Sequence, residues 1–244
     1  MLTLVGTLAP ITRNSLLHGF MLTNERVFLK QFFSRYHTTG SVLPSSRALA
    51  GALCRYVGEE GRRAQGTGRS VGDKGQHILE VGPGTGAVTA SLVTKMLPSD
   101  RLTLVELNDD FVRHLRDRFE KEPAFAAVAD RTEILHTRLE DLPQERRFDL
   151  IISGLPLNNF AVAEVEAILD IFARLIAPGG TLSFFEYIAI RRVKALVSGR
   201  AGRERLRGIG AALHRTLDGR EIKRDWVWPN VPPAWVHHVR WNDE

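Results

Sequence analysis

The 244-residue sequence predicts an α/β fold, in which a mostly parallel sheet of seven strands is flanked by helices and preceded by an N-terminal helical extension. From His77 onward, apolar strand-like runs alternate with helical runs, the order that produces a parallel sheet with right-handed crossovers. Glycines directly after the first run mark a sharp strand-to-helix turn. Near the end of the chain, two strand-like pieces are separated by a proline-rich stretch, as expected for an antiparallel closing pair.

The expected elements follow one another regularly. Strand-like runs occupy residues 77–81, 101–106, 133–136, 148–153 and 181–187, and the closing pair occupies 221–228 and 234–241. Helical patterns occupy residues 87–96, 110–121 and 161–176, and a basic helical stretch runs from 191 to about 217. The stretch Pro178-Gly179-Gly180 is a typical helix stop.

The region before residue 76 is expected to form three parts. Residues 1–23 are predicted to be a poorly ordered extension, 24–57 two N-terminal helices, and 58–75 a basic glycine-rich linker, leaving 76–244 as the α/β domain. In the first helix, aromatic residues recur on one face and basic residues occupy the others. This pattern suits a helix lying in a lipid headgroup layer, or one docked on the core. The aromatic residues are Phe28, Phe32, Phe33 and Tyr36.

Charge and cysteine content limit the kinds of partner and of covalent cross-link that the chain can have. The formal net charge is +5, and between Gly180 and Arg224 there are eleven Lys or Arg against four Asp or Glu. An anionic partner is therefore expected, and both nucleic acid and an anionic membrane surface fit that sign. The single cysteine, Cys54, excludes an intramolecular disulfide and is expected to be a small packed residue. No apolar run approaches the roughly 20 residues that span a bilayer, and no cluster has metal-ligand spacing.

A glycine-rich turn followed by a distant carboxylate predicts a nucleoside-binding site. Gly82, Gly84 and Gly86 follow the first strand, and Glu106 ends the second. The glycines allow close backbone approach to a ligand, and the next helix points its N-terminal N–H groups at the turn. A carboxylate in the position of Glu106 accepts hydrogen bonds from ribose hydroxyls in Rossmann-like sheets.

The residues before and within this turn favour one nucleoside over another. The spacing also fits a dinucleotide site, but Glu80 would repel a pyrophosphate and attract a ligand cation. Gly-x-Gly-x-Gly with Pro83 resembles the first motif of class I S-adenosylmethionine-dependent methyltransferases. That resemblance implies S-adenosyl-L-methionine as the cofactor, with Glu80 near its methionine amino group and Glu106 at its ribose. A dehydrogenase is the alternative.

The same resemblance implies where the rest of the cofactor lies. Many members carry Gly-Asp-Ala after the third strand to hold the adenine; here Thr137-Arg138-Leu139 stands in its place, so Glu140 or Asp141 is expected to substitute. Serines before the second helix either close over the methionine end or cap the helix. The expected cofactor-binding residues are Ser41, Ser45, Glu80, Gly82, Gly84, Thr85, Gly86, Glu106, Leu107, Leu139, Glu140 and Ser153.

The loop after the fourth strand, residues 153–160, bears on the substrate. Adenine-N6 dimethyltransferases of ribosomal RNA carry Asn-Leu/Ile-Pro-Tyr/Phe here, and the aromatic residue stacks on the flipped base. In this chain those positions are Gly154 and Leu157, although Phe160 could reach over. A Leu-Pro turn is expected to leave carbonyls free to accept hydrogen bonds from an amine, because proline has no N–H.

This loop, Ser-Gly-Leu-Pro-Leu-x-Asn-Phe, instead resembles the bacterial phospholipid N-methyltransferases, as do residues 40–49, 184–188 and 230–238. The resemblance implies N-methylation of the head-group amine of phosphatidylethanolamine or an ornithine lipid. It also implies a cytoplasmic enzyme, peripheral at the inner face of the membrane, that contacts anionic lipid. Nucleic acid is not expected as a partner, and no obligate protein partner is inferred. An RNA adenine methyltransferase and a non-catalytic membrane-binding module are the alternatives.

The residues expected to handle the substrate fall into two groups. Those at the reacting amine are Gly154, Leu155, Pro156, Glu186 and Tyr187. Those at the lipid or membrane are Phe28, Phe32, Phe33, Tyr36, Arg191, Arg192, Lys194 and His237. His237 and His238 are expected to form an exposed pair at a strand end; the alternative is that they accept a proton near neutral pH or bind lipid phosphate.

Overall fold

The computed structural model describes residues 45–58, 75–143, 145–187, 200–228 and 233–241. The chain divides into two compact units, Met1–Ser41 and Val42–Glu244, and all the described residues belong to the second. The predicted aromatic helix and most of the predicted linker lie outside the described residues.

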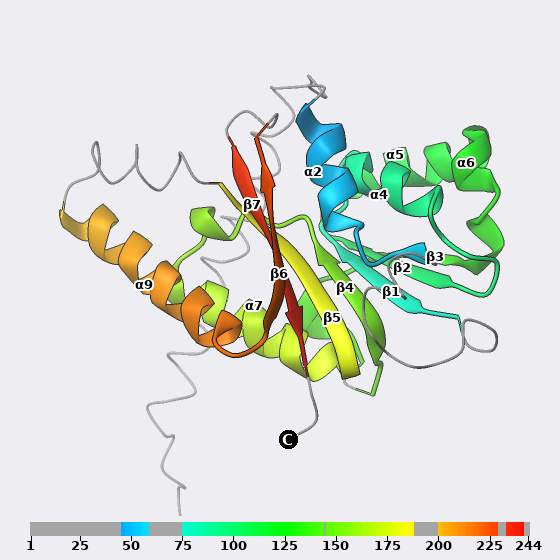
Figure 1. Ribbon diagram of the computed structural model, residues 1–244. Helices are drawn as coiled ribbons and strands as arrows, with labels where there is room; N and C mark the ends of the chain where they lie inside the picture. Colours follow the sequence, from blue (N-terminus) through cyan, green and yellow to red (C-terminus); the bar gives the residue numbers. More distant parts are fainter. Residues whose placement is uncertain (1–44, 59–74, 144, 188–199, 229–232, 242–244) are drawn as a thin grey trace, which may run out of the picture. The chain divides into compact units, whose positions relative to one another are not determined.

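A seven-stranded sheet forms the centre of this unit, with the strand order β3-β2-β1-β4-β5-β7-β6 (Figure 1). The first five strands are parallel, and β7 runs antiparallel between β5 and β6. The predicted α/β fold is therefore confirmed, including its antiparallel closing pair. The strands are β1 His77–Val81, β2 Arg101–Glu106, β3 Thr132–His136, β4 Phe148–Ser153, β5 Ile176–Tyr187, β6 Glu221–Val227 and β7 Ala234–Arg240.

Helices cover both faces of the sheet, with α2, α4 and α5 on one side and α7 and α9 on the other (Figure 1). They are α2 Ser45–Leu53, α4 Ala87–Val93, α5 Asp109–Lys121, α6 Pro123–Ala126, α7 Val162–Leu175 and α9 Arg200–Leu217, with single 3₁₀ turns at η2 Ala129–Arg131, η3 Leu139–Asp141 and η4 Leu157–Asn159. Among these residues no helix is both long and apolar enough to cross a bilayer.

Several boundaries differ from the expected ones, most of them by a single residue, and two differ by more. The fifth strand begins at Ile176, because Ile176 already pairs with Phe148 and the Pro-Gly-Gly stretch lies within an irregular part of the ladder. Helix α4 ends at Val93, three residues earlier than expected, and Thr94 caps it. The short helix α6, which begins with a proline and buries Phe125, was not predicted.

The core between the sheet and the first helices includes α2. Leu49 and Leu53 pack in one cluster with Ile78, Leu92 and Leu150. Cys54 is fully buried in this cluster, and burial raises the pKa of its thiol to about 12. The expectation of a small packed cysteine is confirmed.

We expect Cys54 to be inert toward a thiol reagent such as dithionitrobenzoate in the native protein and to react fully in guanidinium chloride. The reason is that neither the reagent nor hydroxide reaches a thiol that is both buried and held protonated. Absorbance of the released thiolate measures both rates. Rapid labelling under native conditions would contradict the packing of α2 on the sheet.

Candidate active site

The turn after β1 depends on glycine at each of its three positions. Gly82, Gly84 and Gly86 have φ values of 67°, 56° and 78°, a left-handed region that side chains rarely adopt. A Cβ on Gly82 would lie 2.8 Å from Leu155 Cδ2, whereas one on Gly84 would meet no atom within 4 Å. The turn is therefore packed against the β4 loop at Gly82 and open at Gly84, which leaves room for a ligand against the backbone.

The loop after β4 lies directly against this turn. The Gly154 N–H donates to the Val81 carbonyl at 2.9 Å, and a Cβ on Gly154 would lie 2.7 Å from the Gly82 carbonyl oxygen. On the other side, the Gly82 N–H donates to the Val105 carbonyl at 2.9 Å. The carboxyl ends of β2, β1 and β4 are thus tied to one another at a single edge of the sheet.

Glu80 is a buried carboxyl group with one oxygen unsatisfied. Its side chain is fully buried; Oε2 accepts a hydrogen bond from Thr89 Oγ1 at 2.8 Å, and Oε1 has no partner. Burial raises the pKa of Glu80 to about 8, and the nearby Glu106 adds to the shift. A buried acceptor left unpaired is costly, so this position fits a ligand that brings a positive N–H group.

Glu106 is positioned by backbone N–H groups. Gly84 N–H donates to Oε2 at 3.0 Å, and the N–H groups of Leu107 and Asn108 donate to Oε1 at 2.8 and 2.9 Å. Burial raises its pKa, although these hydrogen bonds oppose the shift. The carboxylate is therefore fixed beside the glycine turn, where ribose hydroxyls are expected.

Three supporting residues were not identified from the sequence. Thr89 orients Glu80, Asn108 caps α5, and Arg118 donates to the carbonyls of Thr85 and Gly86 at 2.8 and 2.9 Å. Arg118 comes from a helix that follows the second strand, so no local pattern connects it to the turn. Only the role of Asn108 could have been predicted from the sequence, because asparagine directly before a helix is a common N-cap residue.

The residues predicted at the adenine lie on or near η3. Leu139 is buried, whereas Glu140 is exposed and its Oε1 lies 2.9 Å from Arg138 Nη2. Thr85 is exposed on the glycine turn, and the Leu107 carbonyl lies 3.1 Å from His136 Nε2. Their contact with adenine stays a prediction.

The β4 loop corrects one expectation. The Leu155 carbonyl accepts a hydrogen bond from Leu157 N–H at 3.0 Å, across Pro156 with φ −80° and ψ 81°. This is an inverse γ-turn, which forms because the proline fixes φ near the required value. The Leu155 carbonyl is therefore not left free, and the buried Ser153 hydroxyl accepts from Leu155 N–H at 3.3 Å.

Asn158, in η4, is a further candidate that was not identified from the sequence. Its side chain is 3% exposed and its amide Oδ1 has no hydrogen-bond partner. Phe160 is also buried, at 2% exposed, and its carbonyl accepts from Arg205 at 2.9 Å. Because Phe160 is buried, its ring offers no exposed surface on which a base could stack.

The end of β5 carries a buried polar cluster. Glu186 lies beyond the last β4–β5 pair, and its Oε2 is 3.8 Å from Nε2 of His237 on β7. His237 Nδ1 lies 2.6 Å from Glu221 Oε1, and Nε2 has no hydrogen-bond partner. Tyr187, the last residue of β5, is partly buried and packs against Phe185.

The prediction of an exposed histidine pair is wrong. His237 and His238 are 4% and 0% exposed, because β7 lies inside the sheet between β5 and β6 and not at its edge. His238 Nδ1 lies 2.8 Å from Ser183 Oγ, and its Nε2 3.2 Å from Asp225 Oδ2. Burial lowers the pKa of His238 to about 4, so this ring stays neutral and structural.

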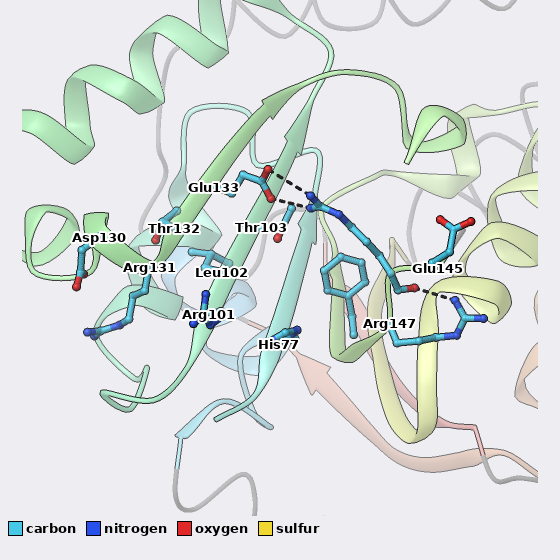
Figure 2. Close-up of a pocket in the computed structure, with 12 residues that line it drawn as sticks. His77, Arg101, Leu102, Thr103, Asp130, Arg131, Thr132, Glu133, Glu145 and Arg147 are labelled. Atoms are coloured by element: carbon cyan, nitrogen blue, oxygen red, sulfur yellow. Dashed lines mark hydrogen bonds and ion pairs between the residues drawn. The ribbon is translucent and has the colours of Figure 1, made fainter. Parts of the chain in front are cut away.

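A cavity of about 580 Å³ lies at the other end of the strands, between the amino ends of β1 to β4 (Figure 2). Among its charged side chains, Arg146 pairs with Glu133 at 2.6 Å and Arg147 donates to the Arg146 carbonyl (Figure 2). In open α/β sheets, ligands bind at the carboxyl ends of the strands. We therefore assign no role in the reaction to this cavity.

Of the remaining predicted site residues, Ser45 is the first residue of α2. Phe28, Phe32, Phe33, Tyr36, Ser41, Arg191, Arg192 and Lys194 lie outside the described residues.

Comparisons with known proteins agree with this arrangement. A family model described as a methyltransferase domain matches residues 78–180, which span β1 to the start of β5. Two solved structures share the fold: an O-methyltransferase of Klebsiella pneumoniae described as putative in its own report, and an O-methyltransferase of Bacillus cereus in complex with SAH. Their TM-scores are both 0.57, with 17% and 16% identity, over 88% of this chain and 90% and 89% of theirs.

Curated relatives differ in what they methylate. An ornithine lipid N-methyltransferase of Singulisphaera acidiphila is 28% identical over 161 residues, covering 64% of this chain and 74% of that protein. A ribosomal RNA small subunit methyltransferase A of a Synechococcus species is 38% identical over 86 residues, covering 34% and 28%. A ubiquinone/menaquinone biosynthesis C-methyltransferase of Ectopseudomonas mendocina is 27% identical over 114 residues, covering 46% and 42%.

We expect cofactor binding to release a proton from Glu80. With a pKa of about 8 in the free protein, Glu80 is protonated at pH 7, and a positive ligand group at Oε1 stabilises the carboxylate. Affinity for S-adenosylhomocysteine, whose amino group is charged, should then rise by up to about tenfold per pH unit from pH 6 and level off above pH 8.

Calorimetry at pH 7 in two buffers of different ionisation enthalpy measures the protons released. Glu80→Gln, which is similar in size and does not titrate, should lack this release. Glu106→Gln serves as the matched control, because the pKa of Glu106 is also raised and any release that it causes must be separated. Equal proton release by wild type and Glu80→Gln would refute the assignment.

Proposed function

This chain is an S-adenosylmethionine-dependent methyltransferase of the class I fold, and we propose that its methyl acceptor is the head-group amine of a membrane lipid, phosphatidylethanolamine or an ornithine lipid. The enzyme would work from the cytoplasmic side, as a peripheral protein at the inner face of the membrane.

The observation that carries the proposal is the composition of the loop after β4. Leu157 occupies the position of the base-stacking aromatic residue of the RNA enzymes, and it is 2% exposed. Phe160, the other aromatic candidate, is buried as well. A flipped adenine is held by stacking on an aromatic or apolar platform, so the absence of an exposed one among the described residues of this loop disfavours a nucleic-acid base.

Coverage of the relatives supports the same choice. The similarity to the ornithine lipid enzyme extends over 64% of this chain, whereas the similarity to the RNA enzyme covers 34%. A match over a larger share of the chain includes more of the residues that could contact a substrate, so the longer match carries more information about the substrate.

The polar groups at this edge suit an amine. When bound, S-adenosylmethionine supplies the methyl group, and the protein's task is to present a neutral nitrogen with its lone pair directed at that methyl. Asn158 Oδ1 is a buried acceptor without a partner and can take one N–H of the head group. Glu186, at the end of β5, offers a carboxylate to the same nitrogen.

Glu186 and His237 together provide a path for the proton that the ammonium must lose. Burial acts to raise the pKa of Glu221, but hydrogen bonds from Arg224 and His237 outweigh it and hold the pKa below its usual range. Glu221 is therefore an acceptor, so His237 Nδ1 carries the hydrogen and Nε2 presents a lone pair toward Glu186. A proton taken by Glu186 can pass to Nε2, where the resulting imidazolium lies between two carboxylates.

The substrate is tested by offering the purified protein radiolabelled S-adenosylmethionine with anionic vesicles that contain phosphatidylethanolamine or ornithine lipid, and in parallel unmodified ribosomal RNA. We expect label in lipid and none in RNA. Glu106→Ala, which removes the ribose carboxylate, is the background control. Label in RNA with none in lipid would overturn the proposal.

We expect Glu186→Gln to lower kcat by roughly 10²-fold at pH 7, the lower range for loss of a general base, with little change in cofactor affinity. The deficit should shrink as the pH approaches the pKa of the free amine, because less substrate then needs deprotonation. Glu133→Gln makes the same chemical change at the opposite edge of the sheet and should leave kcat unchanged. A deficit that does not vary with pH would indicate a structural role for Glu186.

A further inference from the structure

The large exposed apolar side chains of the described residues gather at one place. They are Ile222, Trp226 and Trp228, with exposures of 38%, 59% and 67%. All three lie on β6 or directly after it, and β6 is the edge strand of the sheet. Single exposed apolar residues are ordinary, but a group of them on one strand marks an interaction surface.

The two tryptophans belong to a preformed cluster on one face of the strand. The Trp226 ring lies 5.3 Å from that of Trp235 and 5.4 Å from that of Trp228, and the Arg224 guanidinium lies 5.8 Å over Trp235. We call Arg224, Trp226, Trp228 and Trp235 the tryptophan patch. On the opposite face of β6, Asp225 pairs with Arg55 and Val227 packs in the core, while Lys223 is exposed.

The chemistry of the patch suits an interface between apolar and aqueous phases. Indole has an apolar body and an N–H donor, and tryptophan is enriched at the headgroup level of membranes. The acids of β6 face histidines, Glu221 toward His237 and Asp225 toward His238, while Lys223 is exposed. Arg224 lies within the patch and the neighbouring Lys223 is exposed, so basic side chains adjoin the tryptophans and attract an anionic lipid surface.

The patch lies at the same end of the sheet as the proposed methyl-transfer site, where the parallel strands have their carboxyl ends. Val227 pairs with Ala234, and Ala234 pairs with Tyr187, which follows Glu186. We propose that the tryptophan patch docks on an anionic bilayer and so holds the carboxyl edge of the sheet against the head groups. This rests on the proposed function only in that the bilayer is taken to carry the substrate.

The docking is tested first by fluorescence quenching with vesicles of phosphatidylcholine and phosphatidylglycerol that include brominated phosphatidylcholine. The chain has four tryptophans. Trp241 provides the internal control, because it follows the end of β7 that lies away from the patch, where its backbone N–H donates to the Gly180 carbonyl. Trp241→Phe leaves only patch tryptophans and should be quenched on vesicle binding. A variant with Trp226, Trp228 and Trp235 all changed to Phe should not.

The second measurement is vesicle affinity by sedimentation. Trp226→Ala with Trp228→Ala should weaken binding about tenfold or more, the effect expected for removing two interfacial aromatic side chains. Trp241→Ala should change it little. Methylation of short-chain phosphatidylethanolamine dispersed as monomers should survive the double change, whereas methylation of vesicle lipid should fall with the loss of binding.

The outcomes separate the two proposals. Unchanged vesicle binding by the double variant overturns the docking surface, whatever the substrate is. Quenching of the patch without methylation of any lipid retains the surface and overturns the proposed substrate. A self-association that the double variant abolishes, without quenching by vesicles, assigns the patch to a second copy of the chain and overturns docking on a membrane.

Discussion

The close backbone contact between β1 and β4, at Gly82 and Gly154, is the constraint on which the site depends. Because a side chain at Gly154 would collide with the Gly82 carbonyl, only glycine lets the Gly154 N–H reach Val81. The hydrogen bond from Gly82 to Val105 extends the same restraint to β2. The loops that we propose bind the cofactor and face the methyl acceptor are thereby held at a fixed separation, which methyl transfer requires.

Glu80 Oε1, Asn158 Oδ1 and His237 Nε2 are among the buried polar atoms that have no hydrogen-bond partner within the described residues. They come from β1, from the loop after β4 and from β7, so the sequence separates them widely and the sheet brings them to one side. Leaving such an atom unpaired costs about 1–3 kcal/mol. A protein that keeps several of them near one edge gives up stability there, as binding sites do, and a cofactor and an amine can supply the missing partners.

Much of this fold could be predicted from the sequence, for identifiable reasons. The bounds of β1, β2 and β4 agree with prediction because each is a short apolar run between polar or turn-forming residues, and parallel strands in the middle of a sheet are buried on both faces. The glycine turn was recognised because its backbone conformation restricts the residue type. That Glu80 and Glu106 bind a ligand beside it stays a prediction. The end of the helix before Pro178 was predicted to within one residue, because α7 ends at Leu175. The strand start at Ile176 was missed, since only tertiary pairing with Phe148 determines it.

The remaining parts of the site could not be predicted because they depend on contacts across the sheet. The burial of His237 and His238 follows from the insertion of β7 between β5 and β6, and nothing in the local sequence distinguishes an inner strand from an edge strand of that type. Asn158 was passed over because its importance lies in an unpaired atom, and the Leu155 carbonyl was misjudged because Pro156 closes a γ-turn there. Arg118 reaches the glycine turn from another helix.

The account as a whole is tested most directly by a crystal structure with S-adenosylhomocysteine and a short-chain phosphatidylethanolamine bound together. We expect the amino group of the nucleoside ligand to interact with Glu80 Oε1, directly or through water, and the lipid nitrogen to lie within hydrogen-bond distance of Asn158 or Glu186, facing the sulfur. A lipid amine bound away from Pro156, or a Glu80 that stays unpaired with the ligand in place, would contradict it.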